Sequence, residues 1–150
     1  MLIEPAYTRR VSHDLDYYRE VSSVFEENEP IVKLLALSSA HTADEMFTAV
    51  VAAIDGQAEV THSGVEGLLE ISAPGVTKAG TLDRLCKEWG VTPEEVVAFG
   101  DMPNDLAVLA YAGAGYAMAN AHHLVLAATE RRTLSNDEDG VAAVLERLYG

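Results

Sequence analysis

The sequence is poor in two features that would each assign it to a class of protein. It has a single cysteine, Cys86, which excludes an intrachain disulfide, and an apolar helical pattern around Cys86 predicts that it is buried. Only 10 residues are lysine or arginine, against 24 aspartates and glutamates, and the formal net charge is -14. Because nucleic acids and anionic membranes are bound mainly through lysine and arginine, we expect neither as a partner.

Long apolar runs and a leader pattern are also missing. No apolar run approaches the roughly 20 residues of a membrane-spanning helix, and the start "MLIEPAYTRR" lacks the basic-then-apolar order of a secretory signal. What is present is a hydrophobic fraction of 49% in a chain of 150 residues, which suits one ordinary domain with a real core. We therefore expect a globular cytoplasmic protein.

The order of apolar and turn-forming residues predicts three segments. Residues 1–30 are polar and charged, and they predict only a loose helix or an arm without regular structure. Residues 31–73 predict a strand, a helix that opens with a capping box from Thr42 to Glu45, and two short antiparallel strands. The sequence Ala73-Pro74-Gly75 breaks this pattern, so we place the boundary of the next segment there.

Helices and strands alternate over residues 74–150. A helix starts at Thr77 or Lys78 and ends at Gly90, and Thr92 opens a second capping box before the apolar run 96–99. Further strands are expected at 115–119 and 132–134, with helices at 103–111, 122–128 and 141–148. Such alternation is typical of an α/β fold with a parallel sheet, whose ligand sites lie beyond the carboxyl ends of the strands.

The stretch "VVAFGDMPNDLAVLAYAG" places polar side chains at such a strand end. Asp101 follows the apolar run directly, and Asn104 and Asp105 open the next helix. A carboxylate there can bind Mg²⁺, which takes one or two carboxylates together with water and phosphate oxygens. Asn104 can donate to an oxyanion, and Asp105 can hold a metal-bound water or fix a lysine. All three are also common helix caps, so this stretch alone leaves both interpretations open.

A longer stretch makes the functional interpretation specific. The sequence "GVTKAGTLDRLCKEWGVTPEEVVAFGDMPNDLAVLAYAGAGYAMANA" resembles the haloacid dehalogenase-like hydrolase superfamily, and the Cof-type magnesium-dependent phosphatases fit best. In that family a G-[VI]-[ST]-K-G-x-x-L segment precedes a G-D-x-x-N-D motif, and here Lys78 precedes Asp101 by 23 residues. The tail "SNDEDGVAAVLERL" also resembles the family, although Asn136 and Asp139 within it are equally interpreted as helix caps.

The resemblance implies roles for four residues. Lys78 would contact the transferring phosphoryl group as a catalytic and phosphate-binding residue, and Asn104 would bind the substrate phosphate. Asp101 would be a ligand of the Mg²⁺ cofactor, and Asp105 would support catalysis from just behind. The implied substrate is a small phosphorylated metabolite of the sugar-phosphate type. The sequence departs from the family at Ala79-Gly80, where glycine usually follows the lysine directly.

One part of the family's machinery does not match. The nucleophilic aspartate of the family stands in an apolar strand followed by D-x-D-G-T, and the aspartyl-phosphate forms on it. The D-x-D in this sequence, Asp14-Leu15-Asp16, follows the polar stretch "AYTRRVSH" and precedes two tyrosines, so we do not assign Asp14 as the nucleophile.

These observations predict the C-terminal half of a Cof-type phosphatase. The expected fold is α/β, with a partial Rossmann-like parallel sheet in residues 74–150 and part of the family's α/β cap in residues 31–73. Because missing core strands would leave an apolar sheet edge open, we expect a homo-oligomer or a complementing chain. Three functions stay open: a phosphatase, a non-catalytic truncated homologue that acts by self-association, and a subunit whose site is completed by a partner.

The remaining aromatic and histidine residues give weaker signals. Trp89 is expected in the core near a helix end. His122 and His123 would point apart on a helix, so they predict surface or cap roles and not a metal pair. His41 and His62 are isolated in the sequence and predict nothing.

Overall fold

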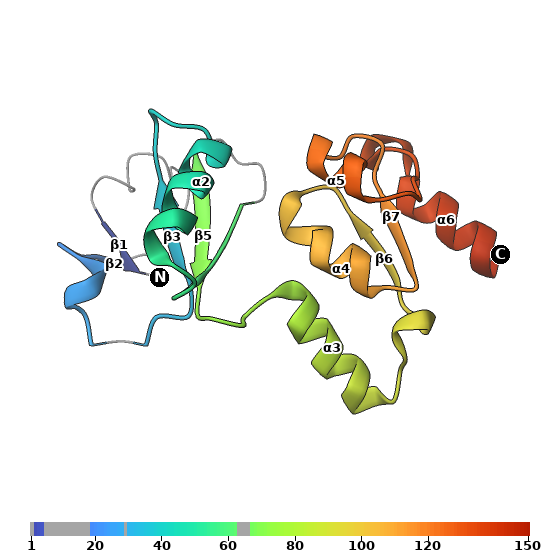
Figure 1. The fold of residues 1–150 in the computed structure, drawn as a ribbon, viewed down its shortest axis with the longest axis horizontal. Coiled ribbons are helices and arrows are strands. Elements are labelled where there is room, and N and C mark those ends of the chain that lie inside the picture. The colour runs from blue at the N-terminus through green and yellow to red at the C-terminus, as the bar shows by residue number, and fades with distance from the viewer. Residues whose placement is uncertain (1, 5–18, 29, 63–66) are drawn as a thin grey trace. The chain divides into compact units, whose positions relative to one another are not determined.

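A computed structural model describes residues 2–4, 19–28, 30–62 and 67–150 of the chain. The chain divides into two compact units, Met1–Val32 and Lys33–Gly150. Figure 1 labels the main helices and strands. In the first unit, β1 (Leu2–Ile3) pairs in parallel with β2 (Arg19–Glu20), and a short 3-10 helix, η2, covers Val24–Glu26. The described part of residues 1–30 therefore contains a small strand pair in place of the loose helix or irregular arm that we expected.

The second unit begins with an antiparallel sheet. Its elements are β3 (Leu34–Leu37), α2 (Ala43–Ile54), β4 (Glu59–Thr61) and β5 (Leu68–Ser72). The strand order is β3-β5-β4, with Ile71 of β5 opposite Leu34 on one side and Val60 on the other. Leu69 of β5 is fully buried. The predicted strand, helix and two strands are confirmed.

The start of α2 shows why this helix begins where it does. The Thr42 side chain accepts a hydrogen bond from the Glu45 N–H at 3.3 Å, and the Glu45 carboxylate accepts one from the Thr42 N–H at 2.9 Å. This is the expected capping box, which satisfies two of the helix's unpaired amides. The hydrogen bonds from the Thr42 backbone and then its hydroxyl hold the pKa of Glu45 below the usual 4.5.

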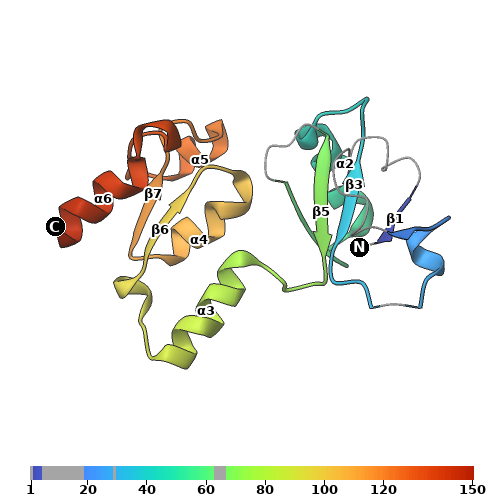
Figure 2. The same ribbon diagram turned by 180° about the vertical axis from the view of Figure 1, so that it is seen from behind.

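Alternating helices and strands follow this antiparallel sheet. They are α3 (Lys78–Trp89), η3 (Pro93–Glu95), β6 (Val97–Gly100), η4 (Pro103–Asp105), α4 (Leu106–Tyr111), β7 (Ala114–Ala117), α5 (His123–Ala128), η5 (Asn136–Glu138) and α6 (Gly140–Tyr149). β6 and β7 pair in parallel (Figure 2), which confirms the α/β fold. The strand expected at 132–134 is reduced to one parallel bridge between Ala117 and Arg132.

A small apolar core lies around the parallel strands. Its buried members come from β6, β7, α4, α5 and the loop after β7: Ala98, Leu109, Ala117, Met118, Ala121 and Val125. Helix α3 buries Cys86, as predicted, but Trp89 is 68% exposed, so the prediction of a core tryptophan is wrong. Trp89 is the last residue of α3, just before the left-handed Gly90, so it stands at the end of the helix and not along its buried part.

Among the described residues, none of the helices combines the length and the apolar character that crossing a bilayer requires.

Candidate active site

The carboxyl end of β6 is fastened to the loop that follows β7. The Gly100 carbonyl accepts a hydrogen bond from the Met118 N–H at 3.0 Å, and the Asp101 carbonyl accepts one from the His122 N–H at 2.7 Å. These two bonds extend the parallel pairing beyond the strands themselves. They fix the backbone of Asp101 at the sheet edge while leaving this residue exposed.

Asp105 links the loop to the lysine of α3. One of its carboxylate oxygens, Oδ2, accepts the N–H groups of Asp101 at 3.2 Å and of Met102 at 3.3 Å. The other oxygen, Oδ1, lies 2.6 Å from Nζ of Lys78. The Asp105 side chain is 14% exposed and the Lys78 side chain 54% exposed, so the carboxylate is held inside the loop and the ammonium group reaches it from solvent. The expectation that Asp105 fixes a lysine agrees with this geometry.

Gly100 makes room for this carboxylate. A Cβ atom at Gly100 would lie 2.5 Å from Cβ of Asp105 and 3.1 Å from its Oδ2. The backbone of Gly100 is ordinary strand backbone, so glycine is required here by close approach and not by its conformational freedom.

Lys78 is positioned by the start of α3. Thr77 caps this helix, and its hydroxyl accepts the Gly80 N–H at 3.0 Å, so Lys78 is the first helical residue. The Ala79-Gly80 departure from the family pattern leaves this cap in place. A Cβ atom at position 80 would lie 3.1 Å from the Thr77 hydroxyl, so glycine fits closely beneath the cap.

The oxygen atoms around Asp101 could bind Mg²⁺ only together with further ligands. No described residue hydrogen bonds to the Asp101 side chain, so its carboxylate is free to bind a cation. The Oδ1 atom of Asn104 is buried without a hydrogen-bond partner among the described residues, and such an orphaned acceptor is costly. No cluster of three or more acidic, histidine or cysteine side chains in the described ranges could hold a metal. Water and phosphate oxygens, which Mg²⁺ favours, would have to complete the shell.

Of the four sequence-predicted residues, three are joined by direct contacts and Asn104 is not. Direct contacts join Lys78 to Asp105, and Asp105 to the backbone of Asp101. Asn104 lies between the two aspartates in the chain, within η4, and no hydrogen bond from a described residue reaches its side-chain oxygen. Asp14 lies outside the described residues.

An asparagine that the sequence analysis did not single out lies after β7. The Asn120 amide donates to Oδ1 of Asn136 at 2.6 Å, and the Asn136 N–H donates back to Asn120 at 3.3 Å. Asn136, the first residue of η5, is thus tied to the loop after β7. Because Ser135 is the N-cap of η5, the interpretation of Asn136 as a cap is wrong. Asp139 does stand at the N-cap of α6, in left-handed backbone, but its side chain makes no capping bond.

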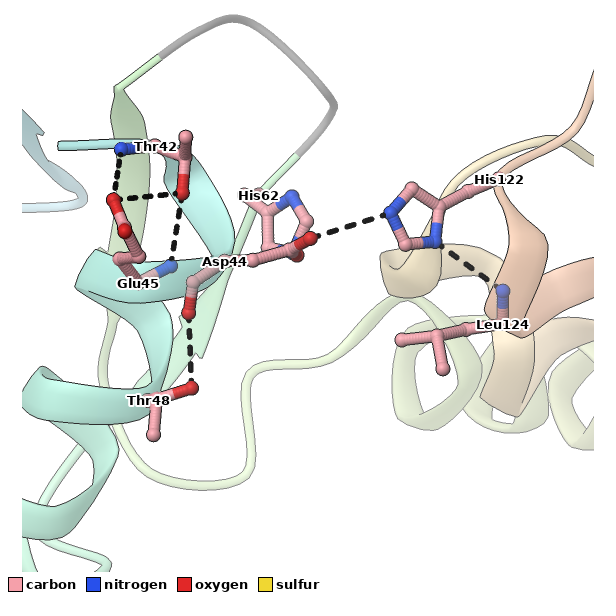
Figure 3. Close-up of polar contacts among 7 residues, drawn as sticks. All are labelled: Thr42, Asp44, Glu45, Thr48, His62, His122 and Leu124. Atoms are coloured by element: carbon pink, nitrogen blue, oxygen red, sulfur yellow. Dashed lines mark hydrogen bonds and ion pairs between the residues drawn. The ribbon is translucent and has the colours of Figure 1, made fainter.

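A histidine pair was also misjudged. His122 caps α5 with its side chain, as one of the predicted roles, but its ring lies 4.2 Å from that of His123, between ring centroids. The two rings do not point apart because the backbone of His122, with a ψ of 143°, is not helical. His122 also faces Asp44 of α2, which contacts His62 in turn (Figure 3). No sequence signal connected these three residues.

Comparison with known proteins agrees with this architecture. The sequence model of the haloacid dehalogenase-like hydrolase family matches residues 5–145 of this chain. One relative is the 5-amino-6-(5-phospho-D-ribitylamino)uracil phosphatase YbjI of Escherichia coli. It is 42% identical over 87 residues, which are 58% of this chain and 32% of that protein. The chain spans about a third of the length of this curated relative.

Solved structures share the fold. A haloacid dehalogenase-like hydrolase from Bacteroides thetaiotaomicron is 34% identical, with a TM-score of 0.67 over 88% of this chain and 50% of that one. The sugar phosphatase BT4131 is 28% identical, with a TM-score of 0.74 over 87% of this chain and 48% of that one. The chain belongs to the haloacid dehalogenase-like hydrolase family, as the motifs around Lys78 and Asp101 predicted.

Proposed function

We propose that this chain provides the lysine, asparagine and magnesium-binding part of a phosphatase site that hydrolyses small phosphate monoesters of the sugar-phosphate type. The observation that carries the proposal is the Lys78–Asp105 pair, at 2.6 Å, attached to the loop that presents Asp101 at the end of β6. The relatives named above are a phosphatase of a phosphoribityl compound and a sugar phosphatase, which supports this substrate class. We also propose a cytoplasmic location, since the substrates are metabolites.

Each residue has a distinct task in this proposal. Lys78 neutralises the phosphoryl oxygens with its half-exposed ammonium group, and Asp105 keeps that group aimed at the site. Asn104 donates its amide to the substrate phosphate, and Asp101 supplies a carboxylate ligand to Mg²⁺. Bound Mg²⁺ would offset the negative charge that builds up on the phosphoryl group. The chain's own contribution is thus the placement of one cation, one amide and two carboxylates.

In this proposal, none of the four residues assigned above is the nucleophile. An apolar strand followed by D-x-D-G-T is not found in these 150 residues. We propose that residues other than these 150, such as those of a complementing chain, supply the attacking aspartate. Because phosphoryl transfer needs all its parts together, the second candidate is a non-catalytic homologue that acts by self-association, and the unmatched motif favours it.

Magnesium-dependent hydrolysis of p-nitrophenyl phosphate by the purified chain tests these alternatives. Turnover that is lost in Asp101→Ala but kept in Asp14→Ala supports the site and sends the search to another nucleophile. Loss in both variants would show that Asp14 is the nucleophile after all. No turnover at any Mg²⁺ concentration, with orthovanadate still bound by the parent chain and not by Lys78→Met, supports a site completed from outside. Absence of both turnover and vanadate binding favours the non-catalytic homologue.

A further inference from the structure

Strand β3 lies at the edge of the antiparallel sheet, with β5 on one side and none of the described strands on the other (Figure 1). The Ser38 N–H donates to the Gly67 carbonyl at 2.8 Å, which fixes the alternation of hydrogen bonds along β3 and β5. Because the backbone groups of an antiparallel strand point alternately to its two sides, those of Leu35 and Leu37 point away from β5. Within the described part of the chain, they form an unpaired row of donors and acceptors along the sheet edge.

The side chains of β3 are apolar and only partly covered. Its sequence is LLAL, none of its four residues is buried, and Leu35 is 36% exposed. Helix α2 packs mainly on β4 and β5, which leaves β3 as the least covered strand of this sheet. Ile31 and Val32, just before the strand, are exposed as well. An apolar edge with unpaired backbone groups is a template for a further strand.

Charge indicates that this further strand comes from a second copy of the chain. The formal net charge is -14, so contact between two copies is unfavourable wherever their carboxylates would face each other. β3 contains no acidic residue, and the carboxylate of Glu70, on the neighbouring strand, lies 2.6 Å from Nζ of Lys33. The β3 edge is therefore close to neutral in a strongly acidic chain, and two copies can meet there without repulsion.

The edges at β4 and β6 are less suitable for pairing between copies. β4 has only three residues and begins with Glu59. β6 is preceded by Glu94 and Glu95 and followed by Asp101, so antiparallel pairing would bring the acidic start of each strand to the acidic end of the other. Like charges that face each other across two strands are destabilising.

We propose that two copies of this chain associate by antiparallel pairing of their β3 strands about a two-fold axis, which joins their two three-stranded sheets into one. Such a pair is self-complementary, because each copy offers the same row of alternating donors and acceptors. The contacting side chains are Leu35 and Leu37, from the part of the sheet that α2 covers least. The dimer does not depend on the proposed phosphatase site, since none of the four residues of that site lies on β3.

Sedimentation equilibrium of the purified chain tests this dimer. The parent chain should show a reversible equilibrium between monomer and dimer. Leu35→Lys should raise the dissociation constant of the dimer at least about 10-fold, because the two-fold axis counts the lost apolar contact and the added charge twice. Leu145→Lys is the matched control: Leu145 lies on α6, is 40% exposed, and its replacement should leave the dissociation constant unchanged. A parent chain that is monomeric at every concentration, or equal weakening by both variants, would overturn the proposal.

Amide hydrogen exchange locates the paired edge in the parent chain and decides the question even if Leu35→Lys fails to fold. The amides of Leu35 and Leu37 should exchange more slowly as the concentration of the chain rises, because only the dimer gives them hydrogen-bond acceptors. The amides of Val97 and Phe99 point away from β7, since the Val96 and Gly100 carbonyls are the ones that pair on that side, and their exchange should not depend on concentration. Protection that grows at β6, or none that grows at β3, refutes the proposal.

Discussion

Replacing Gly100 by alanine should both displace Asp105 in the candidate site and lower the free energy of unfolding of the chain. The new Cβ would lie 2.5 Å from Cβ of Asp105, whereas carbon atoms in contact prefer about 3.5–4.0 Å. Asp105 must therefore retreat by about 1 Å, which moves its carboxylate away from the amides of the loop. Overpacking costs about 1–3 kcal/mol, and each hydrogen bond to a charged group about 1.5–3 kcal/mol.

The overpacking together with the loss of one of the two hydrogen bonds gives an expected loss of unfolding free energy of about 2.5–6 kcal/mol, with the half-exposed Lys78 contact counted as nearly neutral. For a chain of this size that corresponds to a decrease in Tm of roughly 5–24 °C, measurable by circular dichroism. Vanadate binding should weaken in parallel, because the lysine loses its fixed partner.

A second substitution shows whether Asp105 is the obstacle. Asp105→Gly removes the Cβ that the new methyl group would meet. In that background Gly100→Ala should cost no more than about 0.5 kcal/mol. Costs that add in the double variant would mean that the strain arises elsewhere, and the reasoning from close approach would be refuted.

Three further outcomes are expected. Lys78→Met should weaken vanadate binding at least about 10-fold, as measured by isothermal titration calorimetry. Because exposed ion pairs contribute little, it should change the free energy of unfolding by no more than about 0.5 kcal/mol, as measured by thermal unfolding. Val125→Ala, at a fully buried position, should cost about 2–3 kcal/mol in urea unfolding, whereas the exposed Val76→Ala should cost under about 0.5 kcal/mol. The lowered pKa of Glu45 means that its stabilisation of the folded state is present above pH 4.5 and is lost as the pH falls through the lower folded value. Tm measured against pH should therefore drop more steeply for the parent than for Glu45→Gln, and parallel curves would contradict the capping box.

Local signals predicted the elements of this fold well. The capping box at Thr42 and the end of α3 at Gly90 each depend on neighbours within a few residues, and both are present. The strand order β3-β5-β4 depends on contacts between distant residues, which no local pattern encodes. Trp89 was misplaced because a helical pattern predicts which face of a helix is apolar but not how far along the helix that face is buried.

The candidate site shows the same division. Lys78 and Asp105 were singled out because their motifs have a fixed spacing, and the structure adds the 2.6 Å contact between them. The Asp44–His122 contact was missed because its members are far apart in the sequence and belong to no motif. The Asn120–Asn136 hydrogen bond was missed for the same reason, since only folding brings η5 to the loop after β7.

Asp105 uses its two oxygens for different purposes, one to shape the loop and one to meet the lysine. The geometry of the turn and the charge of the site therefore share one side chain and cannot vary independently. An exchange that changed the charge at this position would also change the loop that presents Asp101. Lys78, by contrast, reaches in from solvent and can be exchanged with the loop intact. Variation that tunes the chemistry of this candidate site is accordingly expected on α3, while the aspartate stays constant.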